Sequence, residues 1–135
     1  FHLPDLFTRV MICTDFSKPD IEQLSTGILS GSAEAELFHC VSKGDSDEDI
    51  RRAREQAEEN MNRTVDRYRE MSLPVRTHIR IGDAADEIIR FSEGEDISLI
   101  VVKSTGTRGF VHKIIGGTTE AIARNAKKPL FILRK

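Results

Sequence analysis

Short apolar runs alternate along the chain with segments in which apolar residues recur every three or four positions. The runs are rich in β-branched residues and predict strands at 9–14, 37–41, 75–81, 97–102 and 129–133. The segments between them predict helices at 17–30, 47–71, 85–94 and 116–126, because that recurrence places apolar side chains on one helical face. The predicted order is βαβαβαβαβ.

Capping and breaking residues support the predicted helix ends. Ser17 is a good N-cap, and Pro19 fits the first turn of a helix. Leu73-Pro74 ends the long second helix, because the residue before a proline avoids the helical conformation. Gly82-Asp83 forms the next turn, and Gly94 closes the helix that follows it.

Strict alternation of strands and helices predicts an α/β domain: a Rossmann-like sandwich with a five-stranded parallel sheet and helices on both faces. Parallel neighbours need long crossover connections, which helices supply. Ligands of such sheets bind beyond the carboxyl ends of the strands, where the strand order reverses. The loops after Thr14, Val41 and Val102 are therefore the candidate ligand-binding loops.

Composition narrows the class of protein. A chain of 135 residues with 39% hydrophobic residues fits one domain, which we place at 7–135 behind an N-terminal arm at 1–6. No apolar run approaches the about 20 residues that cross a bilayer, and we expect a cytoplasmic protein without a membrane partner. The formal net charge of −2 gives no positive field for nucleic acid.

The cysteines and histidines do not form a metal-binding pattern. Cys13 and Cys40 have no zinc-type spacing, and both fit the interpretation of buried strand residues; their thiols would be close if the two strands are neighbours. His39 is interpreted as a core or ladder histidine, and His2 and His78 have no ligand neighbours at suitable spacing. We assign no metal.

A series of segments in order resembles the universal stress protein family, represented by UspA. They are 10–17, 81–88, 100–102 with the glycine-rich loop that follows, 116–122, 124–126 and 128–133, and the similarity extends from Phe7 onward. The resemblance implies the strand order 3-2-1-4-5 and a homodimer formed through the last strand, Leu130 to Leu133. It also implies a site for ATP, ADP or AMP, with or without Mg, in a protein of the stress response.

The glycine loop after the fourth strand departs from the family motif G-x2-G-x9-G-[S/T]. Lys103 takes the place of the first glycine, Gly106 and Gly116 match the second and third, and Gly117 replaces the serine or threonine. A second alignment of the motif takes Gly106 as its first glycine and Gly109 as its second. It needs a two-residue deletion, because seven residues instead of nine then precede Gly117-Thr118. Lys103 either blocks the phosphates or supplies a positive charge to them, and the sequence leaves both roles open.

The resemblance assigns the nucleotide-binding residues as follows. The adenine lies near Thr14, Asp15 and Val41, with Asp15 also suited to capping the first helix. The phosphates lie near Lys103 and the backbone amides of the glycines, because free amides at a helix start attract anions. The helix-start residues are Gly116, Gly117, Thr118 and Thr119, and the basic loop 108–113 follows Gly106.

No catalytic motif is present, so we expect slow ATP hydrolysis at most. Two functional hypotheses remain. The first is a regulatory domain that binds an adenine nucleotide at the carboxyl edge of the sheet. The second is a nucleotide-independent dimerising module, such as one part of a longer protein. An α/β enzyme using the same cleft is a third and weaker hypothesis, because no acid or base for it is apparent.

Overall fold

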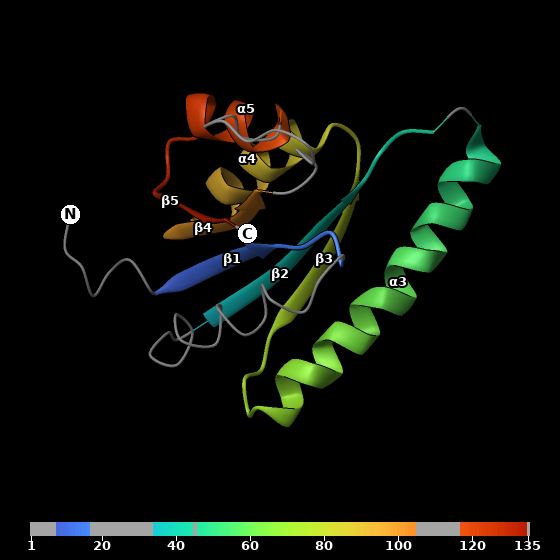
Figure 1. Ribbon diagram of the computed structural model, residues 1–135, viewed down its shortest axis with the longest axis horizontal. Helices are drawn as coiled ribbons and strands as arrows, with labels where there is room; N and C mark the ends of the chain where they lie inside the picture. The colour runs from blue at the N-terminus through green and yellow to red at the C-terminus, as the bar shows by residue number, and fades with distance from the viewer. Residues whose placement is uncertain (1–7, 17–33, 45, 105–116, 135) are drawn as a thin grey trace.

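The computed structural model describes residues 8–16, 34–44, 46–104 and 117–134. Its strands form one five-stranded sheet in the order β3-β2-β1-β4-β5, with every neighbouring pair parallel (Figure 1). The strands are β1 (Arg9–Cys13), β2 (Glu34–Val41), β3 (Arg76–Ile81), β4 (Leu99–Ser104) and β5 (Leu130–Arg134). The predicted fold class and strand order are confirmed.

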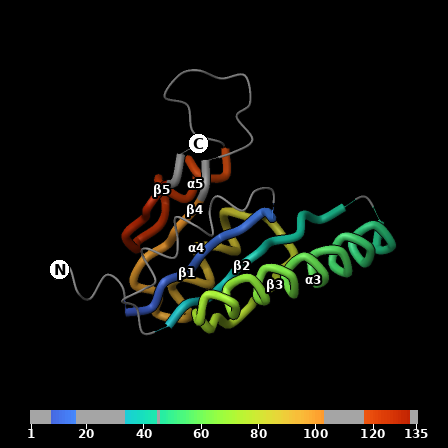
Figure 2. The backbone as a smooth tube through the Cα atoms, turned by 60° about the horizontal axis from the view of Figure 1, so that its bottom comes forward, coloured from blue at the N-terminus to red at the C-terminus, as the bar shows by residue number. Residues whose placement is uncertain are grey.

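Helices cover both faces of this sheet. They are α3 (Asp47–Glu70), α4 (Ala84–Gly94) and α5 (Gly117–Asn125). Figure 2 shows α3 on one side of the strands and α4 with α5 on the other. The predicted helix at 17–30, the arm at 1–6, Gly106 and Gly116 lie outside the described residues.

Two apolar clusters, one on each face, hold the layers together. On the α3 face, Met61 and Tyr68 pack against the strand residues Ile12, Leu37 and Val101. On the other face the cluster joins β1, β2 and β4 to α4 and α5; its members include Met11, Phe38, Ile100, Val102, Ile88, Phe91 and Ile122. Alternate residues of each strand thus enter opposite clusters, as expected for a sheet buried on both sides.

Strand β2 begins at Glu34, three residues before the predicted start at 37. Glu34 and Glu36 are polar, so the apolar pattern does not include this part of the strand. Both residues nevertheless pair with β1 across the sheet. Strand β4 begins at Leu99 instead of 97. The Ile97 amide donates a hydrogen bond to the carbonyl oxygen of Ser92, which closes α4 before the strand starts.

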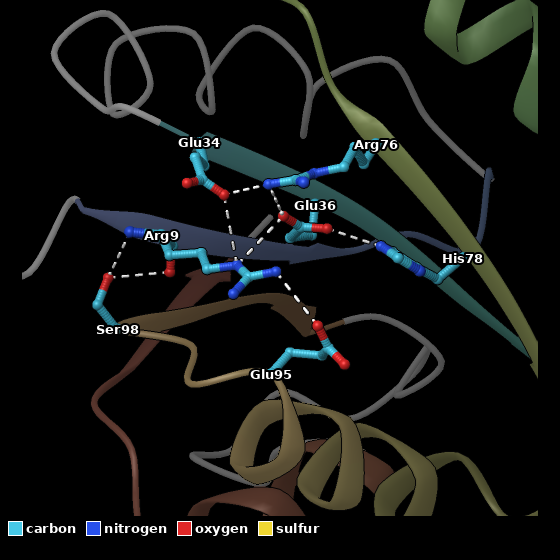
Figure 3. Close-up of polar contacts among 7 residues, drawn as sticks. All are labelled: Arg9, Glu34, Glu36, Arg76, His78, Glu95 and Ser98. Carbon is cyan, nitrogen blue, oxygen red and sulfur yellow. Dashed lines mark hydrogen bonds and ion pairs between the residues drawn. The ribbon is translucent and has the colours of Figure 1, made fainter.

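Glu36 is fully buried, and its carboxylate contacts three basic side chains (Figure 3). Its carboxylate lies 3.3 Å from Arg9 Nε, 3.2 Å from an Arg76 guanidinium nitrogen and 2.7 Å from His78 Nε2. Arg9 also contacts Glu95, 3.2 Å away, and Arg76 pairs with Glu34. We call these six side chains the amino-edge cluster, because β1, β2 and β3 start there.

At the opposite end of the strands, a tight turn connects β3 to α4. Gly82 follows β3 with a φ of 152°, a conformation that residues with a Cβ rarely adopt, and a Cβ there would lie 3.1 Å from Glu87. The next residue, Asp83, caps α4 by accepting a hydrogen bond from the Asp86 amide at 3.0 Å. The chain therefore passes from β3 into α4 without a long loop.

Candidate functional site

A cavity of about 390 Å³ opens at the carboxyl edge of the sheet. It lies at the switch point of the fold, because β1 is the strand between β2 on one side and β4 on the other. The described residues that line it are Cys13, Thr14, Asp15, Phe38, His39, Cys40, Ala84, Ile88, Val102, Gly117, Thr118, Thr119 and Ile122.

The lining divides by chemistry into an apolar part and a polar part. Phe38, Val102 and Ile122 belong to the apolar cluster under α4 and α5 and also line the cavity. The polar lining residues come from the turn after β1, from His39 on β2 and from the start of α5. A flat apolar group with polar attachments is the kind of ligand that such a cavity accepts.

The start of α5 supplies the anion-binding part of the cavity. Gly117, Thr118 and Thr119 form its first turn, where backbone amides lack partners within the helix and the helix dipole favours negative charge. A Cβ placed at Gly117 would meet nothing within 4 Å, so there is open space beside this helix end. The arrangement suits a phosphate or carboxylate group.

The turn that follows β1 contributes Asp15 to the lining of the cavity. Phe16 follows it with a φ of 63°, a left-handed conformation that costs a bulky residue about 1–3 kcal/mol. The Phe16 amide donates a hydrogen bond to Thr14 Oγ1 at 3.0 Å, and the Phe16 ring packs against the His39 ring at a tilt of 39°, with centroids 4.4 Å apart. These contacts offset the strain and hold the turn.

The two cysteines lie in neighbouring strands and line the same cavity as free thiols. Burial raises the pKa of Cys13 far above its usual range, and the nearby Cys40 raises it further. Burial also raises the pKa of Cys40, with the carboxylates of Glu87 and Asp83 as further causes. Both groups are therefore protonated at neutral pH and behave as small apolar lining residues rather than as nucleophiles.

The structure brings together five of the nine residues predicted for the site. Thr14, Asp15, Gly117, Thr118 and Thr119 all line the cavity. Val41 is not among its described lining residues; it is buried, and its carbonyl accepts a hydrogen bond from the Gly82 amide at 2.9 Å.

The remaining three predicted site residues are Lys103, Gly106 and Gly116. Lys103 lies on β4 opposite Leu133 of β5, and the two glycines lie outside the described residues.

His39 is the polar lining residue that the sequence analysis missed. It lies in the strand ladder, as interpreted from the sequence, and its ring Nδ1 also lies 2.7 Å from the carbonyl oxygen of Thr14 in the switch-point turn. The signal available in the sequence was its position, two residues before the end of a predicted strand. Within the described ranges, no group of three or more His, Cys, Asp or Glu side chains could hold a metal ion.

None of the described helices has both the length and the apolar character that a membrane span requires.

Solved structures with this fold cover nearly the whole chain. UspA from Lactobacillus plantarum superimposes with a TM-score of 0.79 at 18% identity, covering 95% of this chain and 98% of that chain. A family member from Arabidopsis thaliana with AMP bound has a TM-score of 0.67 at 18% identity, covering 95% and 92%. The Archaeoglobus fulgidus protein in complex with dAMP has a TM-score of 0.66 at 17% identity, covering 94% and 98%.

Sequence relatives agree with this fold. Universal stress protein MJ0531 of Methanocaldococcus jannaschii is 27% identical over 82 residues, which are 61% of this chain and 48% of that protein. The match therefore spans about half of that relative. Universal stress protein MJ0577 of the same organism is 22% identical over 121 residues, 90% of this chain and 70% of that protein. The model of the universal stress protein family matches residues 7–134, and this chain belongs to that family.

Proposed function

We propose that this domain is a regulatory module that binds an adenine nucleotide in the cavity at the switch point. The observation that carries the proposal is the pairing of an anion-binding helix start with an acidic turn in one partly apolar cavity. Relatives solved with AMP and dAMP support it, because they share the fold. A cavity of this size also lies within the usual range of small-molecule sites.

Charge determines which way the nucleotide lies. The Asp15 carboxylate repels phosphate, whereas the start of α5 attracts it. We therefore orient the phosphates toward Gly117, Thr118 and Thr119, and the ribose and adenine toward Asp15. Ribose hydroxyls and the adenine amino group are donors, which a carboxylate accepts. The adenine face then covers apolar lining residues such as Phe38 and Val102.

A thermal unfolding series with ATP, ADP and AMP, with and without Mg²⁺, tests this proposal. If the dissociation constant is about 10 μM, a concentration of about 1 mM stabilises the fold by roughly 2.7 kcal/mol. That raises the melting temperature by several degrees in a domain of this size. An unchanged melting temperature with all three nucleotides, together with no nucleotide released from the denatured protein, would leave only the nucleotide-independent module.

We further propose that the chain forms a homodimer through β5. This strand is at one edge of the sheet, and Phe131 on it is 42% exposed. An exposed apolar edge strand tends to pair with another chain, and a symmetric pair satisfies both copies at once. Such a dimer is independent of what occupies the cavity.

Phe131→Glu should convert the dimer to a monomer, because it places a charge in the centre of the proposed contact. Light scattering after gel filtration measures the change. Met71→Glu is the matched control, since Met71 is also 42% exposed but follows α3 rather than lying on β5. A wild-type monomer at tens of micromolar, a concentration that detects weak association, would contradict the proposal.

A further inference from the structure

We propose that His39 is the positioning residue of the nucleotide site, which holds the turn of Asp15 in its binding geometry. His39 acts through two contacts, a hydrogen bond to the backbone of Thr14 and a stack against the ring of Phe16. The proposal rests on the proposed nucleotide function, but the part that concerns the turn is measurable without any nucleotide.

Thr14 is held in place in this turn, because its amide, its hydroxyl and its carbonyl each have a hydrogen-bonding partner. Its amide donates to the Phe38 carbonyl oxygen at 2.9 Å, and its hydroxyl oxygen accepts from the Phe16 amide at 3.0 Å. Its carbonyl oxygen lies 2.7 Å from His39 Nδ1. Asp15 stands between Thr14 and Phe16, so these bonds determine where its carboxylate lies.

The direction of the His39 bond follows from its partner. A carbonyl oxygen only accepts hydrogen bonds, so Nδ1 carries the proton and donates it. In the neutral ring the proton is then on Nδ1 and not on Nε2. This tautomer is observable by nitrogen NMR of the ring, which gives the proposal a spectroscopic signature.

His39 is itself held rigidly enough to position a neighbour. It lies on β2, which is internal to the sheet, and it pairs with Ile79 of β3. Phe16, which stacks on it, also packs against the apolar cluster of the α3 face. Phe16, in its left-handed conformation, is thus supported by the His39 ring. That ring is held by its own backbone on β2 and by its hydrogen bond to Thr14.

Loss of the His39 donor should release the turn. The Thr14 carbonyl would lose its partner, and other conformations of Asp15 and Phe16 would become populated. Measured affinity falls in proportion to the fraction of molecules in the competent conformation. The structure therefore links a histidine on β2 to the acid on the β1 turn.

Three variants separate the donor from the ring. His39→Phe keeps a ring for Phe16 but cannot donate, His39→Asn keeps a donor at the place of Nδ1, and His39→Leu keeps neither. We expect calorimetric titration with AMP to show about five- to tenfold weaker binding for His39→Phe, the effect of one lost hydrogen bond, a loss at least as large for His39→Leu, and substantial rescue by His39→Asn. A His39→Phe protein that binds AMP as tightly as wild type would overturn the proposal.

Hydrogen exchange tests the turn itself in the unliganded protein. The Phe16 amide should exchange faster in His39→Phe than in wild type, while the β1 amides of Met11 and Ile12 report any change in global stability. Unchanged Phe16 exchange, or a wild-type His39 ring protonated on Nε2, would overturn the positioning role. If wild type binds no AMP, the nucleotide function fails separately, and these two measurements still decide the role of His39.

Discussion

Glu36→Ala is expected to lower the free energy of unfolding by about 3 kcal/mol, the largest loss that we predict for a single side chain. Glu36 is 0% exposed and is the shared acceptor of Arg9, Arg76 and His78 in the amino-edge cluster. Removing this buried acid is strongly destabilising, because Arg9 and Arg76 are then left with the exposed carboxylates of Glu34 and Glu95. We expect the lower end of the usual range, since Arg9 and Arg76 retain partial access to water.

Urea unfolding of wild type and variant measures this loss, and the melting temperature should fall by about 10 °C. Glu34→Ala is the matched control from the same strand and the same cluster. Glu34 is 46% exposed, and a pair of that kind contributes about 0–1 kcal/mol. An equal loss of unfolding free energy in the two variants would contradict the prediction, because burial would then add nothing to the contribution of Glu36.

Gly117→Asp is expected to weaken nucleotide binding by a factor of about 100 or more while leaving the fold intact. A carboxylate about 4 Å from a phosphate is repelled by roughly 4 kcal/mol at an effective dielectric constant near 20. The same carboxylate stabilises the start of α5, typically by about 0.3–1 kcal/mol. Stability and affinity should therefore change in opposite directions, which simple damage to the fold would not produce.

Gly117→Ala and Gly117→Asn are the controls for this substitution. A Cβ fits at this position without contact, so neither should unfold the protein. Asparagine has nearly the shape of aspartate without its charge, and it should bind nucleotide far better than the aspartate variant. Titration calorimetry compares the three, and equal affinity of the Asp and Asn variants would place the phosphates away from α5.

The sequence predicted the fold because its strands and helices have strong, regular apolar patterns. It failed at the start of β2, where Glu34 and Glu36 interrupt the pattern. A buried acid is stable there only because Arg9 and Arg76 from neighbouring strands contact it. That pairing depends on strand register, which one strand alone does not reveal.

The candidate site was predictable where it follows from local rules. Asp15 at a strand end and Gly117 at a helix start are positions that the fold class itself indicates. The apolar lining was not predictable, because it requires β1, β2, β4 and two helices to meet at one place, and His39 was indicated by no more than its position near a strand end. Val41 also ends its strand, but it is not among the described residues that line the cavity, and its contact with adenine stays a prediction.

The central claim is that an adenine nucleotide binds in the cavity with its phosphates at the start of α5. A nitrogen–proton NMR titration of the purified chain with AMP tests both binding and location in one experiment. We predict saturable shifts of the Gly117, Thr118, Thr119 and Asp15 amides, and unchanged signals from Arg76 and His78 in the amino-edge cluster. No shift up to about 10 mM AMP, the limit of very weak affinity, or shifts confined to the amino edge would contradict the claim.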